Sequence, residues 1–195
     1  MEYLKATELS FDPRLQISEM VVDAFYDLIK HFPSETIPKI IKALAASLVL
    51  EHFYVATEGE EVASIVAVKA DKPPPINLER KILVKHLGLI NGNIAYEMLD
   101  KYMVNHKYPF ELSPLTGSIE IVATSSKYRG LGVAAGLVEH ALAQFPHTEY
   151  VLEVIDTNKP AIRLYEKLGF CEITRKEAPN HSGFNYFLYM SRRSS

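Results

Sequence analysis

The chain has 195 residues, of which 48% are apolar and 23% charged, with a formal net charge of −3 and a single cysteine, Cys171. A slightly acidic chain has no overall attraction for nucleic acid or an anionic membrane, and one cysteine excludes an intrachain disulfide framework. With no signal-like N-terminus and no apolar run longer than residues 43–50, the sequence predicts one globular domain over 1–195 in the cytoplasm, not in a membrane.

The first half of the sequence predicts a strand, two helices and a hairpin. Apolar residues recur at helical spacing through both helices, and Pro33 separates them. Gly59 lies between two strand-like runs and marks a tight turn. In chain order we expect a strand at 3–8, helices at 15–28 and 37–50, and strands at 53–57 and 62–68.

The clearest break in the chain is the run Asp71-Lys72-Pro73-Pro74-Pro75. After it, apolar residues again recur at helical spacing until the run Tyr108-Pro109-Phe110. This block is too short and too locally patterned for a second domain. We therefore predict a helical insertion at residues 76–110.

The second half alternates strands and helices. We expect strands at 118–124, 150–155, 170–175 and 184–190, a helix at 133–145 and a frayed tail at 191–195. Asn158 and Pro160 are suited to open a further helix, and Gly169 to end it in the left-handed conformation. Cys171 is expected to pack in the core.

The turn from Tyr128 to Gly136 has the composition of a phosphate-binding loop. It reads Tyr-Arg-Gly-Leu-Gly-Val-Ala-Ala-Gly, and it lies between a predicted strand and a predicted helix. Glycines let the backbone approach an anion, and the N–H groups at a helix start point toward it. The pattern therefore predicts a ligand that carries phosphate.

Two motifs in this half resemble those of the GNAT superfamily of acetyl-CoA-dependent N-acetyltransferases. The first is Arg129-x-x-Gly132-x-Ala134, and the second is Asn158-x-x-Ala161-x-x-Leu164-Tyr165-x-x-Leu168-Gly169-Phe170. The resemblance implies an α/β (α+β) fold with a mixed, mostly antiparallel central sheet flanked by helices. It also implies an N-acetyltransferase in which a primary amine of a peptide or small molecule attacks acetyl-CoA directly.

The resemblance further implies a coenzyme A site made largely of backbone groups. Loop amides would receive the pyrophosphate, the pantetheine arm would lie like an added strand against the strand before the loop, and Asn158 would contact the coenzyme or cap its helix. The expected coenzyme-binding residues are Val122, Ala123, Thr124, Arg129, Gly130, Leu131, Gly132, Val133, Ala134, Ala135, Asn158, Ala161 and Tyr165. The seven histidines show no metal-ligand spacing, so we expect no metal.

Two side chains are the expected catalytic groups. Tyr165 matches the family's frequent general acid, which protonates the leaving thiolate; the alternative is a core aromatic on its helix face. Glu120, expected on one strand face with Ser118, Val122 and Thr124, lies where some members carry a general base; the alternative is a surface carboxylate paired across the sheet.

The remaining expectations concern the oxyanion, other bases and the acceptor side. The resemblance implies an oxyanion donor among the backbone amides near Ala123. Weaker candidates for the base are Glu111, Glu153 and His181. The insertion carries four aromatic residues that either line the acceptor side of the site or anchor the insertion to the sheet: Tyr96, Tyr102, Tyr108 and Phe110.

Two other functions compete with this assignment. One is a non-catalytic acyl-CoA sensor with the same fold. The other is a dinucleotide-binding oxidoreductase, favoured by Gly130-x-Gly132-x-x-x-Gly136 and by Glu153, 21 residues after Gly132, but opposed by the long basic loop. A homodimer formed by pairing of the C-terminal strands is a further expectation.

Overall fold

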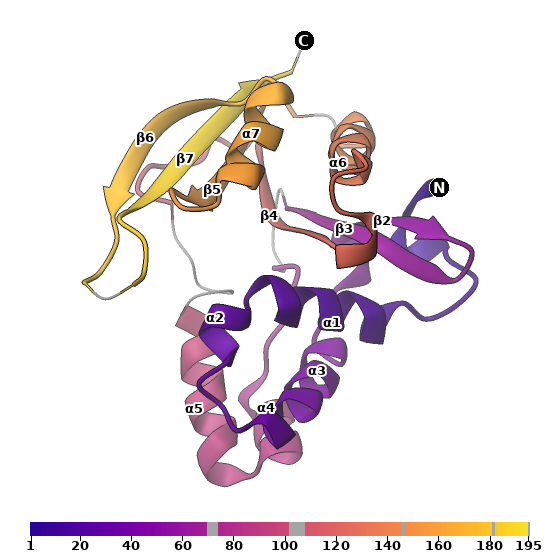
Figure 1. The fold of residues 1–195 in the computed structure, drawn as a ribbon, viewed down its shortest axis with the longest axis vertical. Coiled ribbons are helices and arrows are strands. Elements are labelled where there is room, and N and C mark those ends of the chain that lie inside the picture. The colour runs from indigo at the N-terminus through magenta and orange to yellow at the C-terminus, as the bar shows by residue number, and fades with distance from the viewer. Residues whose placement is uncertain (70–73, 102–107, 146, 181, 195) are drawn as a thin grey trace.

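The computed structural model describes residues 1–69, 74–101, 108–145, 147–180 and 182–194. Its centre is a seven-stranded sheet in the order β1-β2-β3-β4-β5-β7-β6 (Figure 1). Neighbouring strands are antiparallel except β4 and β5, which are parallel. The strands are β1 Glu2–Lys5, β2 Phe53–Glu58, β3 Glu61–Lys69, β4 Thr116–Thr124, β5 Glu149–Ile155, β6 Cys171–Glu177 and β7 Tyr186–Arg193. The mixed, mostly antiparallel sheet is confirmed, and it is not the doubly wound parallel sheet that a dinucleotide-binding domain needs.

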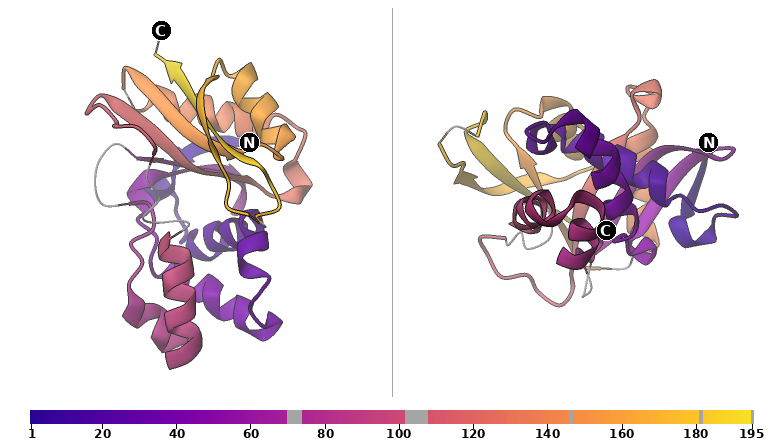
Figure 2. Two further views of the ribbon diagram at one scale, coloured as in Figure 1. Left: turned by 90° about the vertical axis from the view of Figure 1, so that its left-hand side faces the viewer. Right: turned by 90° about the horizontal axis from the view of Figure 1, so that it is seen from below.

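Helices cover both faces of the sheet, and a separate apolar core lies on each (Figure 2). We call the two sides the α6 face and the α1 face. The α6 face carries α6 Val133–Ala143 and α7 Lys159–Lys167. The α1 face carries α1 Arg14–Ala24, α2 Tyr26–Ile29, α3 Ile37–Ala45, α4 Arg80–Leu87 and α5 Leu89–Leu99. Short 3₁₀ helices are η1 Ala6–Glu8, η2 Ser34–Thr36, η3 Leu50–His52 and η5 Ser126–Tyr128.

The predicted insertion is helical and consists of α4 and α5, which pack side by side at the far end of the α1 face (Figure 1). Gly88 joins them with φ +79°, a conformation that glycine adopts without strain. Gly92 lets the two backbones come very close, because a Cβ built on it would lie 2.5 Å from Val84 Cα. The two helices of the insertion are therefore held against each other by close backbone packing.

Several predicted boundaries differ from the structure; the helix predicted at 37–50, for example, ends at Ala45. The first helix is interrupted at Phe25, whose dihedrals (φ −108°, ψ 26°) are not helical, and the first strand stops at Lys5, where η1 begins. The predicted frayed tail is wrong, because β7 runs to Arg193 and pairs with Glu149 of β5. Cys171 is exposed and not in the core, since it begins β6, the outermost strand of the sheet.

None of the helices in the described part of the chain is both long and apolar enough to cross a membrane. Among the same residues, His, Cys, Asp and Glu side chains do not gather into a group of three or more that could hold a metal ion.

Candidate functional site

A gap opens in the middle of the sheet, between β4 and β5. The parallel ladder pairs Thr116 to Ile119 with Glu149 to Leu152 and then ends, although β4 continues to Thr124 and β5 to Ile155. Beyond Ile119 one edge of β4 still pairs with β3, and the other edge faces the gap. An extended, amide-containing ligand can pair with such an open edge as an added strand does.

The register shows which β4 amides face this gap. Ser125 N–H donates to Ala63 O (3.0 Å), so the 63/125 pair is hydrogen-bonded across β3 and β4. Hydrogen-bonded pairs alternate along an antiparallel ladder, so Ala123, opposite Ile65, also directs its amide to β3. Val122 and Thr124 therefore direct theirs into the gap. Of the amides near Ala123, only those of Val122 and Thr124 thus stay candidates for the expected oxyanion donor.

At the end of β4, the glycine loop leads into the N-terminus of α6. Gly130 and Gly132 have φ values of +78° and +79°, and a Cβ on either would have no neighbour within 4 Å. The first α6 amide that bonds to a backbone carbonyl is that of Gly136, to Gly132 O (3.2 Å). Within the described chain, the amides of residues 130–135 have no hydrogen-bond acceptor. This row of free donors, at the positive end of a helix, suits a pyrophosphate.

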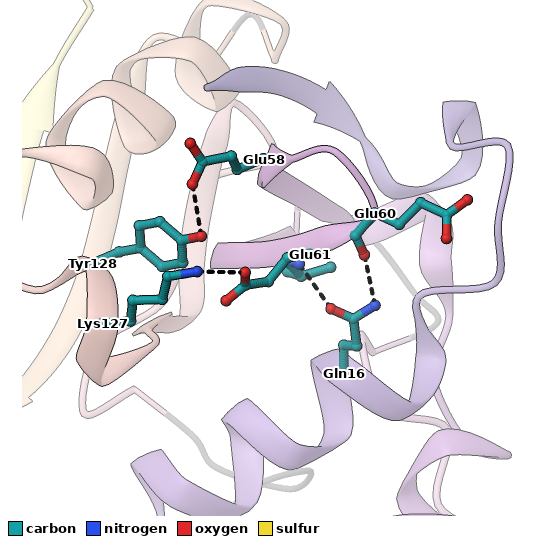
Figure 3. A network of polar contacts seen from close by, with 7 residues as sticks. Gln16, Glu58, Glu60, Glu61, Lys127 and Tyr128 are labelled. Carbon is teal, nitrogen blue, oxygen red and sulfur yellow. Dashed lines mark hydrogen bonds and ion pairs between the residues drawn. The ribbon is translucent and has the colours of Figure 1, made fainter.

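The loop before these amides is fastened to the β2–β3 hairpin (Figure 3). Tyr128 OH donates to Glu58 Oε2 (2.8 Å), and Lys127 Nζ lies 2.7 Å from Glu61 Oε2. The hydrogen bond between them raises the pKa of Lys127 and lowers that of Glu61. Gln16 of α1 binds the same hairpin through Glu60 O and Val62 N–H. These contacts hold the loop against the hairpin, and the hairpin against α1.

Arg129, predicted to bind the coenzyme, has other partners in the structure. Its Nε donates to Thr124 O (3.0 Å), and its Nη2 lies 2.9 Å from Asp23 Oδ2 at the end of α1. The guanidinium therefore links the end of β4 to α1. A direct contact between this side chain and pyrophosphate stays a prediction, and it would compete with Asp23.

The second motif forms the α7 side of the site. Asn158 caps α7, since its Oδ1 accepts the Ala161 N–H (3.2 Å), and its amide nitrogen is left for a ligand. Tyr165 is 6% exposed and packs edge-on against Phe170, with the ring centroids 6.0 Å apart. Its hydroxyl has no hydrogen-bond partner among the described residues, and burial raises its pKa well above the ordinary value. Tyr165 thus keeps its proton and has a free donor.

On the α1 face, a polar cluster lies where β4 and β5 part. A bulge makes Glu120 the extra residue of β4, because Ala67 and Val68 of β3 pair with Ile121 and Ile119. Glu120 Oε1 accepts a hydrogen bond from Ser118 Oγ (2.5 Å). Val122, beyond the bulge, packs with the α6-face core, so the prediction that it shares a face with Ser118 and Glu120 is wrong.

Glu153 and three aromatic rings complete the cluster. Glu153 of β5 follows the last residue paired with β4, as Glu120 on β4 follows the last residue paired with β5. Burial raises the pKa of Tyr189 on β7, and a hydrogen bond to Glu153 raises it further. The ring of Tyr189 lies 5.9 Å from Tyr108 and 5.8 Å from Phe110. The sequence missed Tyr189, which carries no motif and is placed here only by strand pairing.

The other candidates lie elsewhere. Glu111 is exposed. Tyr96 of α5 lies under Arg80 of α4, 4.2 Å from the ring centroid, and packs against the α1-face core, so it joins the two helices of the insertion to each other and to that core. Tyr102 and His181 are outside the described residues. The two carboxylates that the structure brings together at the gap are Glu120 and Glu153.

We expect acetyl-CoA and free coenzyme A to stabilise the protein, and NADH to leave it unchanged. A ligand at a hundredfold its dissociation constant adds about 2.7 kcal/mol, which raises Tm by roughly 5–10 °C in a domain of this size. An Ala134→Asp variant is the control. The new carboxylate at the start of α6 favours the helix, so the fold should persist, but it repels pyrophosphate. The thermal shifts with acetyl-CoA and with coenzyme A should therefore both vanish. Thermal melts of both proteins with the three ligands measure this; a shift with NADH alone would contradict the site.

Comparison with known proteins places these features in context. The model of the acetyltransferase (GNAT) family matches residues 16–170. Human N-alpha-acetyltransferase 30 is 44% identical over 57 residues, 28% of this chain and 16% of the relative. The Schizosaccharomyces pombe protein of that name is 36% identical over 81 residues, 38% of this chain and 54% of the relative. The matches thus span from a sixth to about half of these relatives' length.

Solved structures share the fold at low sequence identity. An N-acetyltransferase from Staphylococcus aureus Mu50 superposes with a TM-score of 0.64 at 20% identity, over 93% of this chain and 96% of its own. A chain of the NatC complex bound to Gag peptide and CoA has a TM-score of 0.57 at 18% identity, with both chains covered fully.

Proposed function

This chain belongs to the GNAT acetyltransferase family, and we propose that it transfers the acetyl group of acetyl-CoA to the α-amine at the N-terminus of a polypeptide. Members of the family are acyltransferase enzymes that use acetyl-CoA. The observation that carries the proposal is the gap between β4 and β5, whose open edge leads to the free amides at the start of α6. The limited similarity to N-alpha-acetyltransferase 30 supports an α-amine as the acceptor.

We assign roles to the groups around the gap. The amides of Val122 and Thr124 would stabilise negative charge on the acetyl carbonyl oxygen as the C–N bond forms. Glu120 or Glu153 would accept the proton that the ammonium group must lose before attack. Tyr165 would hydrogen-bond the sulfur as the C–S bond breaks, and the second proton of the attacking nitrogen would pass to the thiolate through this hydroxyl, so that the phenol ends the step protonated. The two carboxylates also make this face attractive to a cationic amine.

The proposal predicts a clear preference between two peptides of one sequence. The first has a free N-terminus and its lysine side chain blocked; the second has a blocked N-terminus and a free lysine. We expect acetylation of the first only, measured by mass spectrometry and by thiol release from acetyl-CoA. Acetylation of the second alone, or of a small polyamine but neither peptide, would contradict the α-amine proposal.

A further inference from the structure

Ser64 of β3 holds the peptide group between Ala123 and Thr124 on β4. Ser64 is 0% exposed and lies opposite Thr124 in the ladder; its Oγ is 2.9 Å from Ala123 O and 2.9 Å from Thr124 Oγ1. A carbonyl oxygen only accepts, so Ser64 donates its single proton to Ala123 O. The Thr124 hydroxyl therefore donates to Ser64 Oγ. The two hydroxyl groups form a short chain that ends on the Ala123 carbonyl.

The Ala123 carbonyl and the Thr124 amide belong to one peptide group. This group is planar and trans, so its C=O and N–H point in opposite directions, the first toward β3 and the second into the gap. Ala123 and Ile65 form a hydrogen-bonded pair, so the Ile65 N–H also donates to Ala123 O. The carbonyl oxygen thus accepts two hydrogen bonds, and a tilt of the peptide group weakens at least one of them.

The other polar groups of Thr124 leave its amide N–H for a ligand. Its carbonyl accepts a hydrogen bond from Arg129 Nε (3.0 Å), and its hydroxyl donates to Ser64. The second amide that faces the gap, that of Val122, shares a peptide group with Ile121 O, which accepts no side-chain hydrogen bond within the described chain. Side chains therefore fix the direction of the Thr124 amide, whereas the ladder alone fixes that of Val122.

We propose that Ser64 is a positioning residue, which aims the Thr124 amide at a carbonyl oxygen of acetyl-CoA bound in the gap. The inference rests on the proposed function, because it takes acetyl-CoA as the donor, but it does not depend on which amine is acetylated. Hydrogen bonds in series polarise one another, so the bonds to Ala123 O also strengthen the Thr124 N–H as a donor. The oxygen belongs either to the thioester or to an amide of the pantetheine arm. The hydrogen bond is of the same kind in both cases, and the tests below distinguish the two.

The first test is the Ser64→Ala variant, compared with the wild type by steady-state kinetics and by equilibrium binding of free coenzyme A. If the thioester oxygen is the partner, kcat should fall by roughly tenfold with the Kd of coenzyme A unchanged, because the contact strengthens as charge develops. If a pantetheine oxygen is the partner, that Kd should rise by roughly tenfold with kcat unchanged. A change in either constant supports the proposal; kcat and Kd both within twofold of the wild type would overturn it.

Ser47→Ala is the matched control. Ser47 is also buried, and its Oγ donates to a backbone carbonyl at the same distance, Ala43 O at 2.9 Å, but it lies beside the end of α3 and not in the sheet. Its loss removes the same kind of hydrogen bond, so it should lower Tm and leave kcat and the Kd of coenzyme A in place. The same change of these constants in both variants would reflect a general loss of stability and would contradict the role of Ser64. Thermal melts confirm that both variants are folded at the assay temperature.

A double-mutant cycle tests the order of the hydroxyl groups. Thr124→Val removes the outer hydroxyl and leaves Ser64 bonded to Ala123, so its effect alone should be smaller than that of Ser64→Ala. In a Ser64→Ala background, Thr124→Val should change the affected constant by less than twofold, because the Thr124 hydroxyl acts only through Ser64. Equal losses by Thr124→Val in both backgrounds would contradict the chain of hydroxyl groups.

A third measurement needs no acceptor. The Thr124 amide is observed by NMR in protein labelled with ¹⁵N-threonine, and Thr124→Val identifies its signal. A new hydrogen bond from an amide moves its proton signal downfield, so the signal should move when acetyl-CoA is added, and it should move less in Ser64→Ala. Movement with free coenzyme A as well indicates a pantetheine oxygen, and movement with acetyl-CoA alone indicates the thioester. A signal that stays in place, or that moves equally in both proteins, overturns the inference even where α-amine acetylation is measured; a movement that depends on Ser64 supports it whichever amine is the substrate.

Discussion

A Gly92→Ala variant is expected to lose about 2–3 kcal/mol of unfolding free energy, the cost of overpacking a close contact. The new Cβ would lie 2.5 Å from Val84 Cα, 2.7 Å from Val84 N and 2.8 Å from Leu83 C. All three are backbone atoms, which cannot rotate away, so α4 and α5 must separate. The expected fall in Tm is roughly 5–10 °C, measured by calorimetry or circular dichroism.

The sign of this effect distinguishes it from helix propensity. In an exposed helix the same substitution stabilises by about 1 kcal/mol, because glycine is a poor helix former. Ile94→Ala, on the same helix at a side chain that is 55% exposed, is the control and should change stability by less than about 0.5 kcal/mol. A Gly92→Ala protein that melts at or above the wild-type temperature would contradict the close helix contact.

Tyr165→Phe is expected to lower kcat by at least about tenfold, within the range for loss of a general acid. The substitution removes a hydroxyl that has no partner among the described residues, and it keeps the ring against Phe170. Because burial raises the pKa of Tyr165, its phenol stays protonated through neutral pH, so its ionisation should produce no loss of activity there. Steady-state kinetics at saturating acetyl-CoA measures the effect.

Tyr150→Phe is the matched control for this prediction. Tyr150 is also buried, but its hydroxyl donates to Leu142 O (3.0 Å) at the end of α6, away from the gap. Its loss should reduce stability and leave kcat nearly unchanged. If Tyr165→Phe instead retains kcat within twofold, Tyr165 is a packing residue and the acid must be sought elsewhere.

The features that the sequence could predict are those that depend on local spacing. The cap at Asn158, the left-handed Gly169 after α7 and the helical insertion each follow from a few neighbouring residues, and the structure contains them. The family motifs predict the sheet as well, because they occur with a defined strand order. The single-domain organisation and a homodimer through the exposed outer strand β6 stay proposals.

The features that the sequence could not predict depend on strand register. A strand pattern gives no sign of the bulge that makes Glu120 the extra residue and turns Val122 to the opposite face. The direction of the Ala123 amide follows only from the partner that Ser125 has on β3. Tyr108 and Tyr189 come together from segments 81 positions apart, through pairing that no local pattern specifies.

The place of β7 between β5 and β6 has a consequence for biosynthesis. During translation β5, α7 and β6 leave the ribosome before residues 186–193, yet β6 has no partner in the sheet until β7 is inserted. The polar cluster where β4 and β5 part likewise has no Tyr189 until then. The nascent chain can fold β1 to β4 with their helices early, but it cannot complete the surroundings of the gap until this strand has been synthesised. The site is thus still incomplete when most of the polypeptide has already left the ribosome.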